Sequence, residues 1–149
     1  MARRDDSAVP TRGRILAIDP GERRIGVAGA DLGLRVAIPL TTIEGPPDVV
    51  EAVARLVEEE GARALVVGLP LSLSGSPGPQ AQRVQALVEA LAVRLAVPVL
   101  TWDERLTSAE ARRRLASGGG RRHKRDVDAL AAAIILQAYL DSQRQPAAG

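Results

Sequence analysis

Acidic residues stand at three places in the chain where an apolar segment ends or begins: Asp19, Asp103 with Glu104, and Asp126 with Asp128. Carboxylates gathered from separate segments bind divalent cations. The chain has no cysteine and a single histidine, which leaves oxygen ligands and a hard cation such as Mg²⁺ or Mn²⁺. The sequence therefore predicts a metal site, and two ions held there would suit the hydrolysis of phosphodiester bonds.

The composition is that of one globular domain. The chain has 149 residues, of which 46% are hydrophobic, and this is enough to form a single core. We expect a domain over residues 14–141 between loose tails at 1–13 and 142–149. No apolar run approaches the roughly 18 residues of a membrane helix, and the charged start, 1–12, does not resemble a signal peptide. We expect a cytoplasmic protein with no membrane contact.

Basic residues cluster in the second half of the chain, although the formal net charge is only +2. Runs at 112–114 and 121–125 suit a polyanionic partner such as a nucleic acid. A solvated surface produces the same pattern, so both interpretations stay open. Aromatic residues are limited to Trp102 and Tyr139, so base stacking is not expected to carry recognition. The residues of the second run expected to contact substrate are Arg121, Arg122, Lys124 and Arg125.

The pattern of apolar residues predicts the element order βββαβαβαα. Short β-branched or continuous apolar runs bounded by turn residues indicate strands, and three- or four-residue spacing indicates helices. Turn chemistry ends the first strand at Asp19-Pro20-Gly21. The predicted strands are 15–18, 25–30, 36–43, 64–67 and 97–102, and the predicted helices are about 49–60, 80–95, 107–115 and 128–142.

This order predicts an α/β fold whose five-stranded mixed sheet has the strand order 3-2-1-4-5. Helical crossovers make the first, fourth and fifth strands parallel, and the meander adds the second and third strands in antiparallel fashion. Sites in open sheets form outside the carboxyl ends of parallel strands. Asp19, the segment from Gly68 to Pro70, and Glu104 all follow such ends. A final helix that begins near Asp128 would bring its carboxylate to the same edge.

Ordered motifs between residues 14 and 140 carry a family resemblance. The segments Ile15-Leu16-Ala17-Ile18-Asp19-Pro20-Gly21 and Ile25-Gly26-Val27-Ala28 resemble the opening of RNase H-like proteins. Within that superfamily the chain resembles the RuvX (YqgF) family. The motifs that carry this second resemblance are Gly68-Leu69-Pro70-Leu71 with Gly75, Asp103-Glu104-Arg105-Leu106-Thr107-Ser108, and Lys124 with Val127-Asp128-Ala129.

The resemblance implies a single RNase H-like domain and a metal-dependent nuclease. Family members are described as Holliday junction resolvases and are linked to processing of the 5′ end of the precursor of small-subunit (16S) ribosomal RNA. Carried onto this chain, the catalytic metal ligands would be Asp19, Glu104 and Asp128. Asp126 departs from the family pattern and is interpreted either as a further ligand or as the N-terminal cap of the last helix.

Each predicted site residue also has a simpler interpretation. Asp19 fits an ordinary turn, Glu104 a solvated loop, and Asp128 the acid preference of a helix N-terminus. Asp103 is expected to be a structural hydrogen-bonding residue. Arg105 would hold a phosphate or pair with a site carboxylate. Gly68 and Pro70 are expected to border the substrate groove.

Two other functions fit parts of the sequence. A non-catalytic module that binds nucleic acid or the ribosome would keep the fold and use the acids structurally. An actin- or Hsp70-like ATPase would need a second domain, and no Walker pattern supports binding of a nucleotide triphosphate. Junction resolution would further require a two-fold homodimer, because two strands are cut symmetrically. His123 has no partner of the metal-ligand type nearby in sequence and is expected to be exposed.

Overall fold

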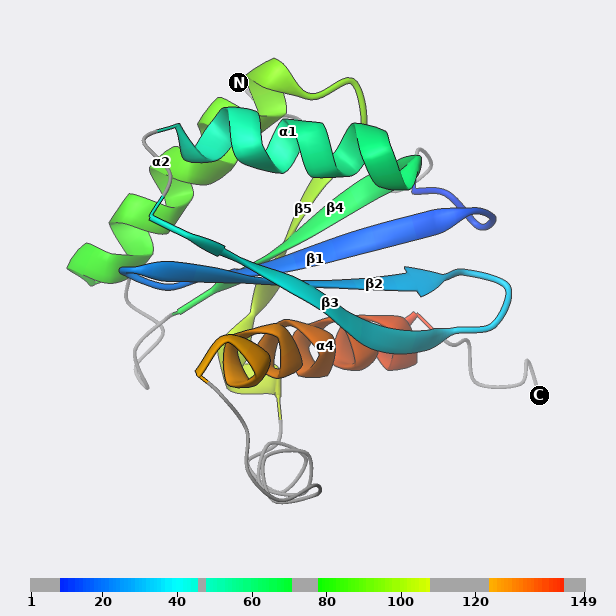
Figure 1. The fold of residues 1–149 in the computed structure, drawn as a ribbon. Helices are drawn as coiled ribbons and strands as arrows, with labels where there is room; N and C mark the ends of the chain where they lie inside the picture. Colours follow the sequence, from blue (N-terminus) through cyan, green and yellow to red (C-terminus); the bar gives the residue numbers. More distant parts are fainter. Residues whose placement is uncertain (1–8, 46–47, 71–77, 108–123, 144–149) are drawn as a thin grey trace.

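The computed structural model describes residues 9–45, 48–70, 78–107 and 124–143, without the side chains of residues 124–126. A twisted five-stranded sheet lies between helices on both of its faces (Figure 1). The strand order β3-β2-β1-β4-β5 confirms the predicted order. The strands are β1 Arg14–Pro20, β2 Arg24–Asp31, β3 Val36–Glu44, β4 Ala62–Leu69 and β5 Val99–Asp103.

Strand β1 occupies the centre of the sheet. It pairs antiparallel with β2 and parallel with β4, and β4 pairs parallel with β5. The side chains of Ile15–Ile18 are at most 1% exposed, which explains why this strand reads as a continuous apolar run. A tight turn closes the β1–β2 hairpin, where the amide of Gly21 donates to the carbonyl of Arg24 at 2.9 Å.

Helices α1 (Val49–Glu60) and α2 (Pro79–Arg94) cover one face of the sheet (Figure 1). The side chain of Asp48 caps the start of α1 by accepting from the amide of Glu51, and Gly61 ends the helix with φ +63°. Arg94 of α2 donates to Glu51 of α1 at 2.6 and 3.1 Å, which ties the two helices together. Both helices lie within a residue or so of the predicted ranges.

Helix α4 (Lys124–Ser142) covers the opposite face alone among the described helices (Figure 1). The prediction that this helix begins near Asp128 was wrong by four residues, because the charged first turn carries no apolar periodicity. A 3₁₀ turn, η2 (Glu104–Leu106), follows β5 and was not predicted. The helix predicted at 107–115 falls almost wholly outside the described residues. No described helix has both the length and the apolar character needed to cross a membrane.

The two faces of the sheet are packed with different side chains. The α1/α2 face is built from leucine, isoleucine and valine, including Leu16, Leu65 and Leu91, each at most 1% exposed. The α4 face contains many alanines, among them Ala17 and Ala64 on the strands and Ala132 and Ala133 on the helix. Small side chains let two backbones approach closely, so α4 lies close to the strands that carry the predicted site.

Candidate active site

Asp19 projects from the α4 face of the central strand. Alternation along β1 places it with Ile15 and Ala17, which belong to the core beneath α4. Its register partner on β2 is Gly26. On the other side Ile18 pairs with Val67, so Gly68 follows next to Asp19 on β4. The carboxylate is therefore flanked by glycine on both neighbouring strands.

Glu104 reaches the same place from the end of β5. A methyl group built on Gly68 would lie 3.1 Å from Oε2 of Glu104 and 2.7 Å from Cδ1 of Ile135. The absence of a side chain at Gly68 therefore leaves the space that the glutamate carboxylate occupies. The end of β5 is fixed by two contacts of Trp102. Its Nε1 donates to Oγ1 of Thr107 at 3.2 Å, and its ring packs edge-on against that of Tyr139 of α4, with the ring centroids 6.1 Å apart.

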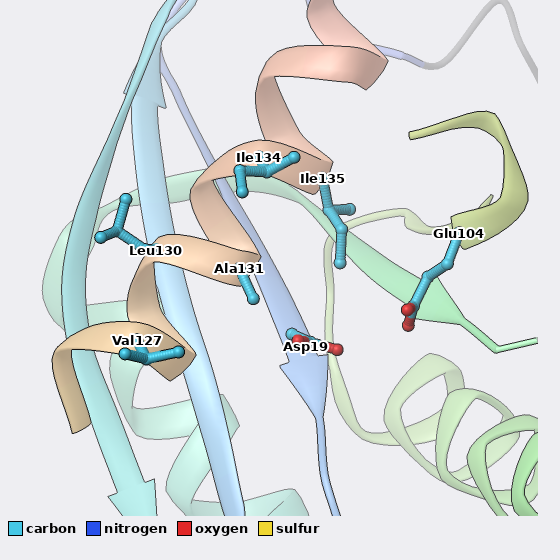
Figure 2. Close-up of a pocket in the computed structure, with 7 residues that line it drawn as sticks. All are labelled: Asp19, Glu104, Val127, Leu130, Ala131, Ile134 and Ile135. Atoms are coloured by element: carbon cyan, nitrogen blue, oxygen red, sulfur yellow. The ribbon is translucent and has the colours of Figure 1, made fainter. Parts of the chain in front are cut away.

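Asp19 and Glu104 line one pocket of about 190 Å³ beside α4 (Figure 2). Their carboxylates enter it from β1 and from η2, while α4 supplies an aliphatic wall. Such a wall lowers the local dielectric constant, which strengthens the attraction between carboxylates and a bound cation. The wall residues are Val127, Leu130, Ala131, Ile134 and Ile135.

Asp128 lies on the same face of the sheet but does not line this pocket. Its backbone oxygen sits over Gly26, where a built methyl group would come within 1.9 Å of it. Its carboxylate accepts a hydrogen bond from Nε of Arg24 at 2.7 Å. Within the described residues no group of three or more acidic or histidine side chains could hold a metal ion. Asp128 is also the fifth residue of α4 and not, as predicted, in its first turn.

Asp103 and Arg105 form a local ion pair at the end of β5. The side chain of Asp103 accepts from the amide of Arg105 at 2.9 Å and from its guanidinium at 2.6 to 3.1 Å. The hydrogen bond from this guanidinium lowers the pKa of the Asp103 carboxyl. In the structure the guanidinium of Arg105 is thus bonded to Asp103, and Asp103 makes the structural hydrogen bonds expected of it.

The other predicted site residues are only partly described. Gly68 lies in β4 against Glu104, and Pro70 directly follows that strand. Lys124 and Arg125, the last two residues of the basic run at 121–125, are the first two residues of α4. Their side chains and that of Asp126 lie outside the described part of the structure, as do Arg121, Arg122 and His123 in full.

Sequence reasoning missed two residues that shape this site, Arg24 and Gly26. Gly26 lets the first turns of α4 approach β2, and Arg24 pairs with Asp128 across 104 positions of sequence. A glycine inside a strand is a recognised signal of close backbone approach and could have identified Gly26. No local pattern could have identified the partner of Arg24.

The chemistry of the pocket fits a divalent cation. Asp19 supplies carboxylate oxygens from the central strand, and Glu104 supplies them from the turn η2 that follows β5. Mg²⁺ is commonly bound through one or two protein carboxylates together with water and substrate phosphate. Two carboxylates in one pocket are therefore a sufficient donor set for such an ion, without a third carboxylate in place.

Comparison with known proteins decides the family. A family model described as "RuvX: Holliday junction resolvase" matches residues 13–142. The chain belongs to the RuvX family. A relative from Chloroflexus aggregans, named "Putative pre-16S rRNA nuclease", is 51% identical over 136 residues, covering 89% of this chain and 96% of the relative. A relative from Desulforudis audaxviator with the same name is 42% identical over 135 residues, which cover 88% of this chain and 96% of the relative.

Solved structures agree with the predicted RNase H-like fold of this RuvX chain. RuvC from Thermus thermophilus, solved in complex with a Holliday junction substrate, superposes with a TM-score of 0.55 at 18% identity. The match covers 88% of this chain and 96% of RuvC. A second Thermus thermophilus RuvC structure gives a TM-score of 0.53. At this level of identity the likeness concerns the fold alone.

Proposed function

We propose that this RuvX protein is a divalent-metal-dependent nuclease that hydrolyses phosphodiester bonds in structured nucleic acid. The observation that carries the proposal is the convergence of Asp19 and Glu104 in one pocket. They reach it from the carboxyl ends of parallel strands, where sites of open α/β sheets form. Family membership supports a nuclease, because the relatives are named for nuclease activity.

Mg²⁺ or Mn²⁺, in the form of two ions, is the proposed cofactor. Asp19 and Glu104 would hold it, with Asp128 as a further ligand and Asp126 as an additional candidate. A bound cation supplies an activated water and offsets the charge that develops on the phosphate. Asp19 would contribute rigidity from the central strand, and Glu104 would act as second ligand or position the attacking water. The aliphatic wall of α4 would limit access of other water to the pocket.

The proposed substrate is the 5′ end of precursor 16S ribosomal RNA, with a four-way DNA junction as the other candidate. The names of the relatives favour the RNA, and the family description favours the junction. Basic residues at 121–125 are proposed to bind the phosphate backbone, which requires cationic partners. We place this activity in the cytoplasm and expect a homodimer only if junctions are the substrate.

One observation favours a second candidate, a non-catalytic module that binds nucleic acid. Asp128 is bonded to Arg24 and does not line the pocket of Asp19 and Glu104. A chain that has lost its catalysis could keep such an arrangement for structural reasons. Cleavage by the purified protein separates the two functions.

The test is a side-by-side digestion of a precursor rRNA leader and a synthetic Holliday junction with Mg²⁺ or Mn²⁺. We expect cleavage that Asp19→Asn and Glu104→Gln each reduce more than about 100-fold, since even groups behind metal ligands cost roughly 10- to 100-fold. Glu22→Gln, at an exposed position in the β1–β2 turn, is the matched control and should retain activity. Equal cleavage by the wild type and Asp19→Asn would refute the catalytic role, and binding without cleavage would support the module.

A further inference from the structure

The ion pair between Arg24 and Asp128 joins the start of β2 to the first turns of α4. Nε of Arg24 donates to Oδ2 of Asp128 at 2.7 Å. The two side chains are 29% and 31% exposed, so the pair is partly withdrawn from solvent. A partly buried pair is held more firmly than a fully exposed one, because water screens it less.

Arg24 lies on the strand next to Asp19, near the candidate metal pocket but outside its lining. It lies two residues before Gly26 and, by alternation, on the same α4 face of β2. Gly26 is the register partner of Asp19. A fixed positive charge at this position opposes the binding of a cation next to Asp19, and it also neutralises the carboxylate of Asp128.

We propose that Arg24 is a positioning residue that keeps Asp128 out of the metal site until a divalent cation exchanges with it. This inference rests on the proposed function. In the described structure Asp128 is bonded to Arg24 while Asp19 and Glu104 line the pocket without it. For Asp128 to join Asp19 and Glu104 around the cation, its side chain has to turn toward the pocket, and in this proposal the Arg24–Asp128 bond opens as it turns.

The sheet offers the released guanidinium a second carboxylate. Glu44 of β3 is the register partner of Arg24. Residues directly opposite each other in an antiparallel pair project to the same face and lie within contact distance. Glu44 therefore stays near Arg24 on the sheet when Asp128 turns to the pocket.

A supporting role for Arg24 would change the metal affinity in the opposite direction. If Arg24 instead supported Asp128 as a ligand from behind, its removal would weaken metal binding, as the loss of groups behind metal ligands does. If Arg24 competes with the cation, its removal strengthens metal binding. The affinity of the protein for Mn²⁺ without nucleic acid therefore distinguishes the two.

The experiment measures Mn²⁺ binding to the full chain by calorimetry and by the electron paramagnetic resonance signal of free Mn²⁺. Arg24→Gln should bind Mn²⁺ about two- to fivefold more tightly than the wild type, the range that opening a partly exposed ion pair allows. The matched control is Arg23→Gln, which removes the same charge from the exposed neighbouring position and should change the affinity less. Equal or weaker binding by Arg24→Gln relative to Arg23→Gln overturns the proposal.

Two further variants keep the result interpretable. In an Asp128→Asn background, Arg24→Gln should change the affinity no more than Arg23→Gln does, because the part of the effect that passes through that carboxylate is lost; an undiminished effect overturns the proposal. Should Arg24→Gln fail to fold by circular dichroism, Arg24→Met carries the test, with tighter binding expected because both the positive charge and the donors are lost. Unchanged or weaker binding by Arg24→Met would then count against the proposal.

The variant Asp19→Asn shows whether a negative result counts against the role of Arg24 or against the proposed metal site. Weakened Mn²⁺ binding by Asp19→Asn, together with equal binding by Arg24→Gln and Arg23→Gln, refutes only the role of Arg24. Unchanged Mn²⁺ binding by Asp19→Asn refutes the metal site itself.

Discussion

The two faces of the central sheet use the same strands for different purposes. On the α1/α2 face, large aliphatic side chains such as Leu16 and Leu65 interlock with those of the helices and are almost completely buried. On the α4 face, the same strands present alanine and glycine, and the helix backbone comes close enough to touch Gly26. The α1/α2 face stabilises the fold through burial of apolar area. On the α4 face, the smaller side chains leave the space in which Asp19 and Glu104 lie.

This division explains why acidic residues are tolerated in the middle of the sheet. A carboxylate between large aliphatic side chains would lose its hydration without compensation. Asp19 instead lies between two strands that present Gly26 and Gly68, and it opens into the pocket beside α4. The free-energy cost of placing Asp19 there is offset by the apolar area buried on the α1/α2 face, since core burial contributes roughly 25 cal/mol per Å² of apolar surface.

The largest effect on stability is expected from the α1/α2 face. Leu65→Ala should lower the free energy of unfolding by about 2–5 kcal/mol, because the side chain is 0% exposed and its loss leaves a cavity. Val93→Ala, at an aliphatic position that is 86% exposed on α2, is the matched control and should stay within about 0.5 kcal/mol. Urea denaturation measures both. Mn²⁺ affinity of folded Leu65→Ala should equal that of the wild type, and a large change would contradict the separation of the two faces.

A smaller effect on stability, coupled to the site, is expected at Gly26. The new methyl group of Gly26→Ala would meet the backbone of Asp128 at 1.9 Å, so the start of α4 must move away from β2. We expect a loss of about 1–3 kcal/mol, as for other overpacked positions, together with weaker Mn²⁺ binding.

Gly29→Ala is the control on the same strand, because the methyl group there points to the opposite face. Its nearest neighbours are Nη2 of Arg14 at 2.7 Å and Cδ1 of Leu40 at 2.9 Å, which are the ends of flexible side chains. This variant should cost less and leave Mn²⁺ affinity unchanged. Identical losses of metal affinity in the two variants would contradict the special role of the α4 face.

The smallest effect is expected at the rim of the site, in the Asp103–Arg105 pair. Because the hydrogen bond from Arg105 lowers the pKa of the Asp103 carboxyl, the pair stabilises the fold above the unfolded-state pKa near 4 and loses this contribution as the pH falls through the lowered value. Asp103→Asn should therefore melt slightly below the wild type at pH 7, and the difference should shrink as the pH falls below about 4. A difference that does not depend on pH would show that charge is not the cause.

The sequence predicted most of the fold and the convergence of Asp19 and Glu104 at one edge of the sheet. The β-branched run of β1 and the acids after β1 and β5 are local signals, and the carboxyl ends of parallel strands meet at one edge. The pairing of Arg24 with Asp128 and the contact of Gly26 with α4 depend on how the last helix docks, which no local pattern encodes. The early start of α4 at Lys124 was missed because its first residues are charged.

The proposal that Asp19 and Glu104 hold the cation is tested by a crystal grown with Mn²⁺ and measured at a wavelength where manganese scatters anomalously. We expect an anomalous peak in the pocket, within about 2.0–2.6 Å of carboxylate oxygens of both Asp19 and Glu104, the range of oxygen ligands to hard cations. We also expect this peak to be absent in Asp19→Asn. A protein that cleaves nucleic acid with Mn²⁺ but binds the ion elsewhere, away from both carboxylates, would contradict the account.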